Sequence, residues 1–157
     1  MDTIIGANHK GALVSLVERC SKYTLIAGVP TKHAQPIAEK VIDLLKPIKD
    51  AVHTLTVDNG KAFADHQNIA NALDAKVYFA HPYSPWQRGL SENTNGLIRQ
   101  YFPKKKYLAS VQLSEIDVVI DKLNNRPRKT LNFDTPTQKF EKLRAPQTHQ
   151  PQIAPQS

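Results

Sequence analysis

The sequence predicts an α/β domain in which five short strands form a mixed sheet flanked by helices. In the first third of the chain, short apolar and β-branched segments alternate with turn residues, a pattern typical of antiparallel strands. Beyond residue 30 the apolar residues recur every three or four positions, and strand and helix patterns then alternate. The 157 residues, 40% hydrophobic and 22% charged, are enough for one compact domain. This order of elements favours an α/β arrangement around a mixed sheet.

The first three strands are predicted at residues 3–6, 12–17 and 23–29. Asn8, Gly11 and Ser21 lie between these segments and favour turns. Linkers this short join neighbouring antiparallel strands, so the three segments should form a meander.

A first helix is indicated by Ile37, Val41 and Leu45, which are spaced to share one face. Thr31 is the expected N-cap, and Pro36 should lie in the first turns. The next predicted elements are a strand at 52–57, a helix at 63–73 and a fifth strand at 76–79.

Two prolines in residues 81–86 interrupt regular structure after the fifth strand. A helix should follow from about Gln87 to Tyr101, with Tyr101 packed in the core, and a last helix over 111–123. Residues 1–144 are then the folded domain. The segment 145–157, with three prolines, four glutamines and no charged side chain, should be disordered.

Composition excludes several classes of protein. Cys20 is the single cysteine, so neither an internal disulfide nor a thiolate zinc site can hold the fold. No apolar run approaches the roughly 18 residues of a membrane span, and no secretory signal opens the chain. We therefore expect a cytoplasmic protein without a membrane partner.

The net charge of +7 is concentrated in residues 87–130, which carry nine basic and four acidic side chains. Such a stretch favours a surface that faces a polyanion such as nucleic acid. A basic helix that only aids solubility is the alternative.

The sequence lacks the motifs of phosphate-loop, zinc-protease and serine-hydrolase sites, so the candidate catalytic residues that remain are acidic. Asp2 begins the first strand, Asp58 ends the fourth, and Glu92 lies on the helix after the proline-rich loop. Three such carboxylates suit two Mg²⁺ or Mn²⁺ ions, which catalyse phosphoryl transfer. Taken singly, Asp58-Asn59-Gly60 is a tight turn and Glu92 a solvated helix residue; their combination indicates a site.

The chain closely resembles the catalytic core of bacterial transposases of the insertion sequence thirty family. This family belongs to the retroviral-integrase-like enzymes with two Asp and one Glu. The stretches that carry the resemblance are residues 2–6, 11–19, 57–60, 81–100, 123–129 and 135–136.

The resemblance implies a ribonuclease-H-like fold and the acidic triad Asp2, Asp58 and Glu92, which would bind two Mg²⁺ or Mn²⁺ ions. It implies DNA transposition, in which DNA ends are cleaved and joined to target DNA. The expected partners are element ends, target DNA and further copies of the chain, at the bacterial nucleoid. We predict no covalent enzyme intermediate, because the motif holds no activated Ser, Tyr or Cys.

The expected DNA-binding residues fall into two groups. Arg88, Asn95 and Arg99 share the helix face of Glu92, and Gly96 beside them would let a DNA backbone approach. Phosphate contacts are expected from Lys104, Lys105, Lys106, Arg126, Arg128 and Lys129. A capped surface helix and a solvated basic face are the alternatives. Tyr83 and Trp86 would stack on bases or form a hydrophobic lid.

The chain departs from the family where Met1 directly precedes Asp2. Family members carry an amino-terminal helix-turn-helix region and further residues of the first strand. We therefore expect a truncated core with a frayed Asp2. The alternatives to an active transposase core are an inactive remnant that binds DNA or intact transposase, and a ribonuclease-H-like nuclease.

Overall fold

The computed structural model describes residues 1–81 and 85–145, without the side chains of His9 and residues 85–88. The predictions for Tyr83, for the side chains of Trp86 and Arg88, and for the tail beyond Ala145 therefore lie outside the described residues.

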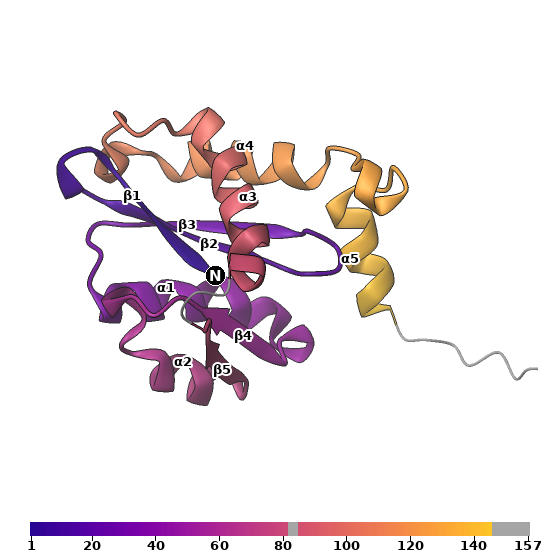
Figure 1. The fold of residues 1–157 in the computed structure, drawn as a ribbon, viewed down its shortest axis with the longest axis horizontal. Coiled ribbons are helices and arrows are strands. Elements are labelled where there is room, and N and C mark those ends of the chain that lie inside the picture. Colours follow the sequence, from indigo (N-terminus) through magenta and orange to yellow (C-terminus); the bar gives the residue numbers. More distant parts are fainter. Residues whose placement is uncertain (82–84, 146–157) are drawn as a thin grey trace, which may run out of the picture.

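The five predicted strands are all present. Three of them, β1 (Asp2–Ile5), β2 (Ala12–Val17) and β3 (Thr24–Val29), form an antiparallel sheet in the order β1-β2-β3. The other two, β4 (Thr54–Val57) and β5 (Lys76–Phe79), pair in parallel. Figure 1 shows the β4–β5 pair below the three-stranded sheet.

The prediction of one continuous five-stranded sheet is wrong in this respect, because the strands form two sheets. All four residues of β1 pair with β2. Next to the start of β1, the Met1 amino group donates to the Thr56 carbonyl of β4. A single hydrogen bond does not pair two strands, so β4 and β5 form a separate two-stranded sheet.

The main helices are α1 (Ala34–Leu45), α2 (His66–Leu73), α3 (Pro85–Tyr101), α4 (Leu113–Asn124) and α5 (Pro136–Arg144). In Figure 1, α1 and α4 lie on opposite sides of the three-stranded sheet. Among the described residues, no helix has the length and apolar character to cross a membrane.

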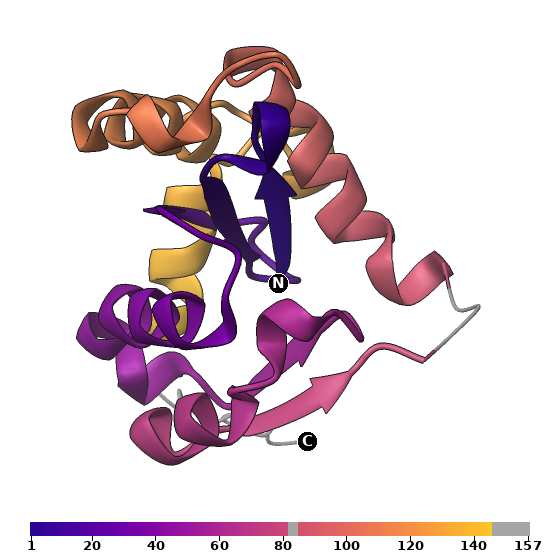
Figure 2. The same ribbon diagram turned by 90° about the vertical axis from the view of Figure 1, so that its left-hand side faces the viewer.

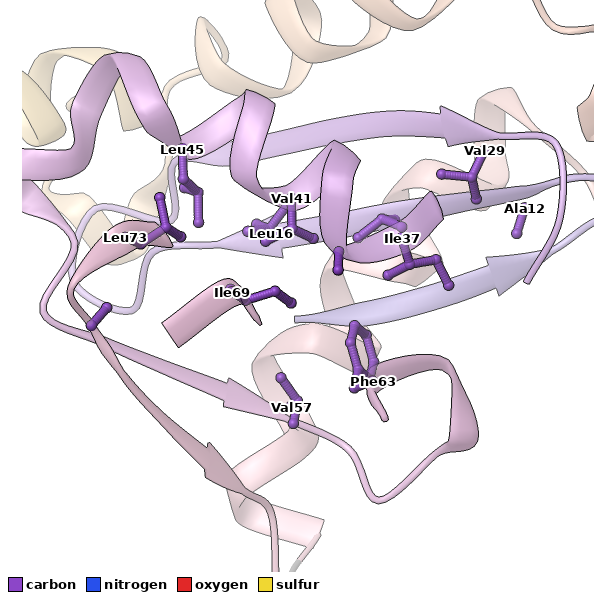
Figure 3. Close-up of a cluster of buried hydrophobic side chains, with 13 residues drawn as sticks. Ala12, Leu16, Val29, Ile37, Val41, Leu45, Val57, Phe63, Ile69 and Leu73 are labelled. Atoms are coloured by element: carbon purple, nitrogen blue, oxygen red, sulfur yellow. The ribbon is translucent and has the colours of Figure 1, made fainter. Parts of the chain in front are cut away.

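The core has two parts, because the side chains of β2 alternate between the faces of the sheet. Ala12, Val14 and Leu16 pack with α1, α2 and β4 in the cluster of Figure 3. Leu13 points the other way and packs with residues of α3 and α4, including Ile98. Both faces of this sheet are therefore buried.

The helix boundaries correct one prediction. α1 begins at Ala34 with His33 as N-cap, not Thr31. With His33 as the cap, Pro36 is the third helical residue, where no intrahelical partner is needed for a backbone N–H. A cap at Thr31 would have placed Pro36 deeper in the helix, where its ring would clash with the preceding turn.

Tyr101 is a second correction. Its side chain is 37% exposed, while the adjacent Phe102 is buried. Neighbouring residues of a helix point about 100° apart, so only one of the two can face the core. The ammonium of Lys122 lies 5.5 Å from the centre of the Tyr101 ring on the outer surface.

The sequence interpretation also missed α5. Its signal was present, since Thr135 is the N-cap and Pro136 opens the helix. The Gln138 amide donates to the Thr135 hydroxyl, and the Gln138 side chain accepts from the Thr135 amide, which makes a capping box.

Candidate active site

Two of the three predicted catalytic residues, Asp2 and Asp58, lie near the Met1 amino group and line one groove. Asp2 opens β1, and Asp58 directly follows β4. The Met1 amino group lies between these strands: burial lowers its pKa, and the charges of Asp2 and Asp58 both oppose that shift. Figures 1 and 2 place this terminus between the three-stranded sheet and the β4–β5 pair.

Asp2 is held in place, contrary to the expectation of a frayed terminus. Its Oδ1 accepts a hydrogen bond of 2.7 Å from the Thr3 amide, and its Oδ2 accepts one of 2.7 Å from Asn95 Nδ2. The carboxylate is therefore tied to its own strand and to α3.

Asn95 connects Asp2 to the interior of the sheet. The Ser15 hydroxyl donates to Asn95 Oδ1 at 2.7 Å, and Ser15 lies opposite Asp2 in the β1–β2 ladder. Ser15 is only 3% exposed. The sequence interpretation assigned Asn95 to the metals or the DNA and missed Ser15, whose signal is a polar residue in an otherwise apolar strand.

Asp58 lies in a turn that follows β4. Its Oδ1 accepts a hydrogen bond of 3.1 Å from the Gly60 amide, and Asn59 Nδ2 donates to the Ala80 carbonyl at 3.4 Å. A Cβ on Gly60 would lie 2.9 Å from Asp58 Oδ1, so glycine fits this close approach. The turn and an acidic site are compatible, because the Asp58 carboxylate still lines the groove described next.

A groove of about 810 Å³ contains Asp2 and Asp58. Its walls come from the β2–β3 turn, β4, β5 and the start of α3, and they include Arg19 and His81. The groove thus combines three acidic residues, Asp2, Glu18 and Asp58, with basic residues such as Arg19, whose guanidinium suits a phosphate-bearing ligand.

Glu92 is placed less directly. It is exposed on α3, next to Leu90 and Ser91 of the groove wall, and lies three residues before Asn95. Among the described residues, no three His, Cys, Asp or Glu side chains gather closely enough to form a metal site. Asp2 and Asp58 therefore share one groove, whereas Glu92 is not among the residues that line it.

Arg99 braces α3 against β1. Its Nη2 donates to the Ile5 carbonyl at 2.8 Å and its Nη1 to the Phe102 carbonyl at 3.4 Å. Partial burial lowers the pKa of the guanidinium below its usual value. These bonds use two of its donors for structure, and its contact with DNA stays a prediction.

Two other predicted DNA contacts also have protein partners. Lys106 Nζ donates to Glu115 Oε2 at 2.7 Å and lies over the Phe102 ring. Arg128 Nη2 donates to the Leu123 carbonyl at 3.1 Å, and its pKa is lowered by burial and by the neighbouring Arg126.

Four of the predicted phosphate contacts are exposed. Lys104 and Lys105 precede α4 in the sequence, and Arg126 and Lys129 follow it. Figure 1 shows this helix above the three-stranded sheet. Gly96 is exposed on α3, and an added Cβ would meet nothing within 4 Å, which leaves room for the close approach predicted there.

No protein-family model matches the chain, but comparisons with known proteins find similar sequences and structures. Over 143 residues it is 47% identical to the transposase of insertion sequence element IS4351 from Bacteroides fragilis, covering 91% of this chain and 44% of that protein. Over 140 residues it is 41% identical to transposase InsI of IS30A from Escherichia coli strain K12, covering 88% and 37% respectively. The chain thus spans less than half the length of these relatives.

Among solved structures, the catalytic core domain of BIV integrase has a similar fold. The TM-score is 0.67 at 21% identity, and the match covers 91% of this chain and 93% of that domain.

Proposed function

We propose that the chain is the catalytic core of a DNA transposase. Its sequence is homologous to transposases of the IS30 family, and its fold is the ribonuclease-H-like fold of an integrase catalytic core. In this proposal it cleaves the ends of an element and joins them to target DNA. The observation that carries the proposal is the pair Asp2 and Asp58 in one groove, with Asp2 fixed by Asn95.

The donor set fits a hard divalent cation. The carboxylates of Asp2 and Asp58 supply the hard oxygen ligands that such a cation prefers. Mg²⁺ is commonly held by one or two carboxylates, with water and substrate phosphates completing its shell. Asp2 and Asp58 would hold Mg²⁺ or Mn²⁺, and Glu92 would contribute at a second ion. Such ions activate the attacking oxygen and stabilise the leaving oxygen in phosphoryl transfer.

The residues of the chain orient the DNA. Arg19 in the groove wall provides a charge for a phosphate, and the hydrogen bonds to Asp2 hold its carboxylate in one orientation. The exposed Lys104, Lys105, Arg126 and Lys129 would contact DNA beyond the groove. Assembly of several copies around two DNA ends is part of the proposal.

The test is divalent-metal-dependent joining of a DNA duplex that carries the terminal sequence flanking this gene. Glu92→Gln should abolish cleavage and joining. DNA binding should be retained, because the exposed basic residues Lys104, Lys105, Arg126 and Lys129 are unchanged. The matched control is Glu39→Gln, an exposed carboxylate of α1 outside the groove, which should behave as the unmodified chain.

Three outcomes would overturn the proposal. They are full joining by Glu92→Gln, a covalent protein–DNA adduct at Tyr101, and cleavage of the RNA strand of a hybrid without any DNA joining.

A further inference from the structure

We propose that Ser15 and Asn95 form a positioning pair that fixes the Asp2 carboxylate and the rotation of α3, and so sets the spacing of the acidic groups. This inference rests on the proposed function, because it assigns the pair to the same acidic site.

Ser15 occupies a position where the fold calls for an apolar side chain. Strand β2 alternates, and Leu13, two residues earlier on the same face, is fully buried against the α3–α4 cluster. Ser15 is 3% exposed on this face, and a buried hydroxyl needs a hydrogen-bond partner. Its short bond to Asn95 Oδ1 supplies that partner.

The hydrogen-bonding groups around Asn95 determine which way its side-chain amide is turned. An ionised Asp2 carboxylate only accepts hydrogen bonds, so the Asn95 amide must turn its Nδ2 towards Asp2. The amide oxygen then faces the interior, where it requires a donor. Ser15 is that donor, and without it the amide loses the contact that holds this orientation.

The same contacts set the rotation of α3. Asn95 bonds the side chain of Asp2 at the start of β1, and Arg99, one turn later, bonds the Ile5 carbonyl at its end. Two anchors one turn apart keep this helix face on β1. Glu92 lies three residues before Asn95 on the same side of α3. The bonds of Asn95 and Arg99 therefore also determine the position of the Glu92 side chain.

An asparagine with a purely structural role bonds backbone groups and not an acidic side chain, as Asn124 does. Asn124 is 2% exposed and bonds both the amide and the carbonyl of Thr24, at 2.8 and 2.7 Å. Its loss should affect stability alone. Asn95, in contrast, holds a carboxylate that lines the groove.

The first test measures Mn²⁺ binding to the full chain without DNA, by calorimetry. Asn95→Ala should weaken the affinity by about 10- to 100-fold, the usual effect of removing a group that orients a metal ligand. Ser15→Ala should weaken it less and should add little in the Asn95→Ala background, since the shorter bond of Ser15 is to Asn95 and its other bond, of 3.4 Å, is to the Asp2 backbone carbonyl and not to the carboxylate. Ser15→Thr, which keeps the hydroxyl, should retain the affinity of the unmodified chain.

Asn93→Ala is the matched control, because Asn93 is an exposed asparagine of the same helix. Its affinity for Mn²⁺ should equal that of the unmodified chain. If Asn95→Ala binds as tightly as Asn93→Ala, the positioning role is wrong.

A second readout needs no metal and separates this inference from the proposed function. In urea unfolding, Asn95→Ala should have a smaller effect in an Asp2→Asn background than in the unmodified chain, because the two groups interact. Additive effects would overturn the inference even if the chain proves to be a transposase. Coupling in a chain that binds no Mn²⁺ would instead support the pair and contradict the metal site.

Discussion

At the scale of single residues, carboxylates in this chain are oriented by donors from their own surroundings. Asp2 accepts from Thr3 and Asn95, and Asp58 accepts from the Gly60 amide. In the β2–β3 turn, Glu18 accepts from the Cys20 amide and from both the amide and hydroxyl of Ser21. Each acidic side chain is therefore part of the local backbone structure as well as a source of charge.

The Glu18 turn gives a prediction about pH. Burial opposes ionisation, but the hydrogen bonds from Cys20 and Ser21 outweigh it and hold the pKa of Glu18 below its usual 4.5. The stability that these bonds confer is therefore present above pH 4.5 and is lost as the pH falls through the lowered pKa. Glu18→Gln should lower the free energy of unfolding at pH 7, and the deficit should shrink in acid.

Urea unfolding at several pH values measures this deficit, with Glu39→Gln as the exposed control. A deficit that stays constant from neutral to acid pH would show that the Glu18 charge does not stabilise the turn.

At the scale of elements, side-chain amides join segments that are distant in the sequence. Asn95 joins α3 to β1, and Asn124 joins the end of α4 to the start of β3. These amides satisfy polar groups that apolar packing would leave unpaired. They therefore fix how the helices lie on the sheet.

Asn124→Ala should destabilise the chain by about 1–3 kcal/mol for each of the two buried Thr24 groups left unpaired. The matched control is Asn125→Ala, because Asn125 is exposed and its side chain donates to Asp121, on the adjacent turn of α4. Chemical denaturation of both variants measures the difference. Equal stabilities would contradict the role of the Asn124 clamp.

The sequence predicted those elements whose periodicity is local. All five strands and α3 followed from apolar spacing, and α3 begins only two residues earlier than expected. The short and mostly polar α5 was missed, because its signal is a capping box and not an apolar stripe. The division into two sheets has no local signal, since it depends on how far β4 runs beside β1.

The candidate site shows the same limit. Spacing on a helix placed Asn95 and Glu92 on one face, but it could not show that Asn95 bonds Asp2, a partner 93 positions away. The number of basic residues indicated a polyanion. It could not show that Arg99, Lys106 and Arg128 also bond to protein groups.

At the scale of the whole molecule, the exposed basic residues expected to contact DNA lie outside the acidic groove. The groove lies between the β4–β5 pair and the β2–β3 turn, whereas Lys104 and Lys105 precede α4 and Arg126 and Lys129 follow it. A DNA that reaches the groove would meet Arg19 there and would also be held by charges elsewhere on the surface. Binding should therefore depend on salt and little on sequence.

The salt dependence distinguishes the three consecutive lysines. Lys104→Ala and Lys105→Ala should each reduce the slope of log affinity against log salt by about 0.9, the loss of one phosphate contact. Lys106→Ala should change it less, because Lys106 is paired with Glu115. Fluorescence anisotropy with a random-sequence duplex measures the slopes. Binding that does not weaken with salt would contradict phosphate contacts.

The most direct test of the acidic site is joining of a 3′-hydroxyl DNA end to target DNA by Asp58→Asn in Mg²⁺ or Mn²⁺. Asparagine keeps the oxygen that accepts from the Gly60 amide, so the turn is preserved while the charge is lost. Asp43→Asn, an exposed aspartate of α1, is the control. We predict joined product from the unmodified chain and from Asp43→Asn, and none from Asp58→Asn. Joining by Asp58→Asn at the unmodified rate would contradict the account.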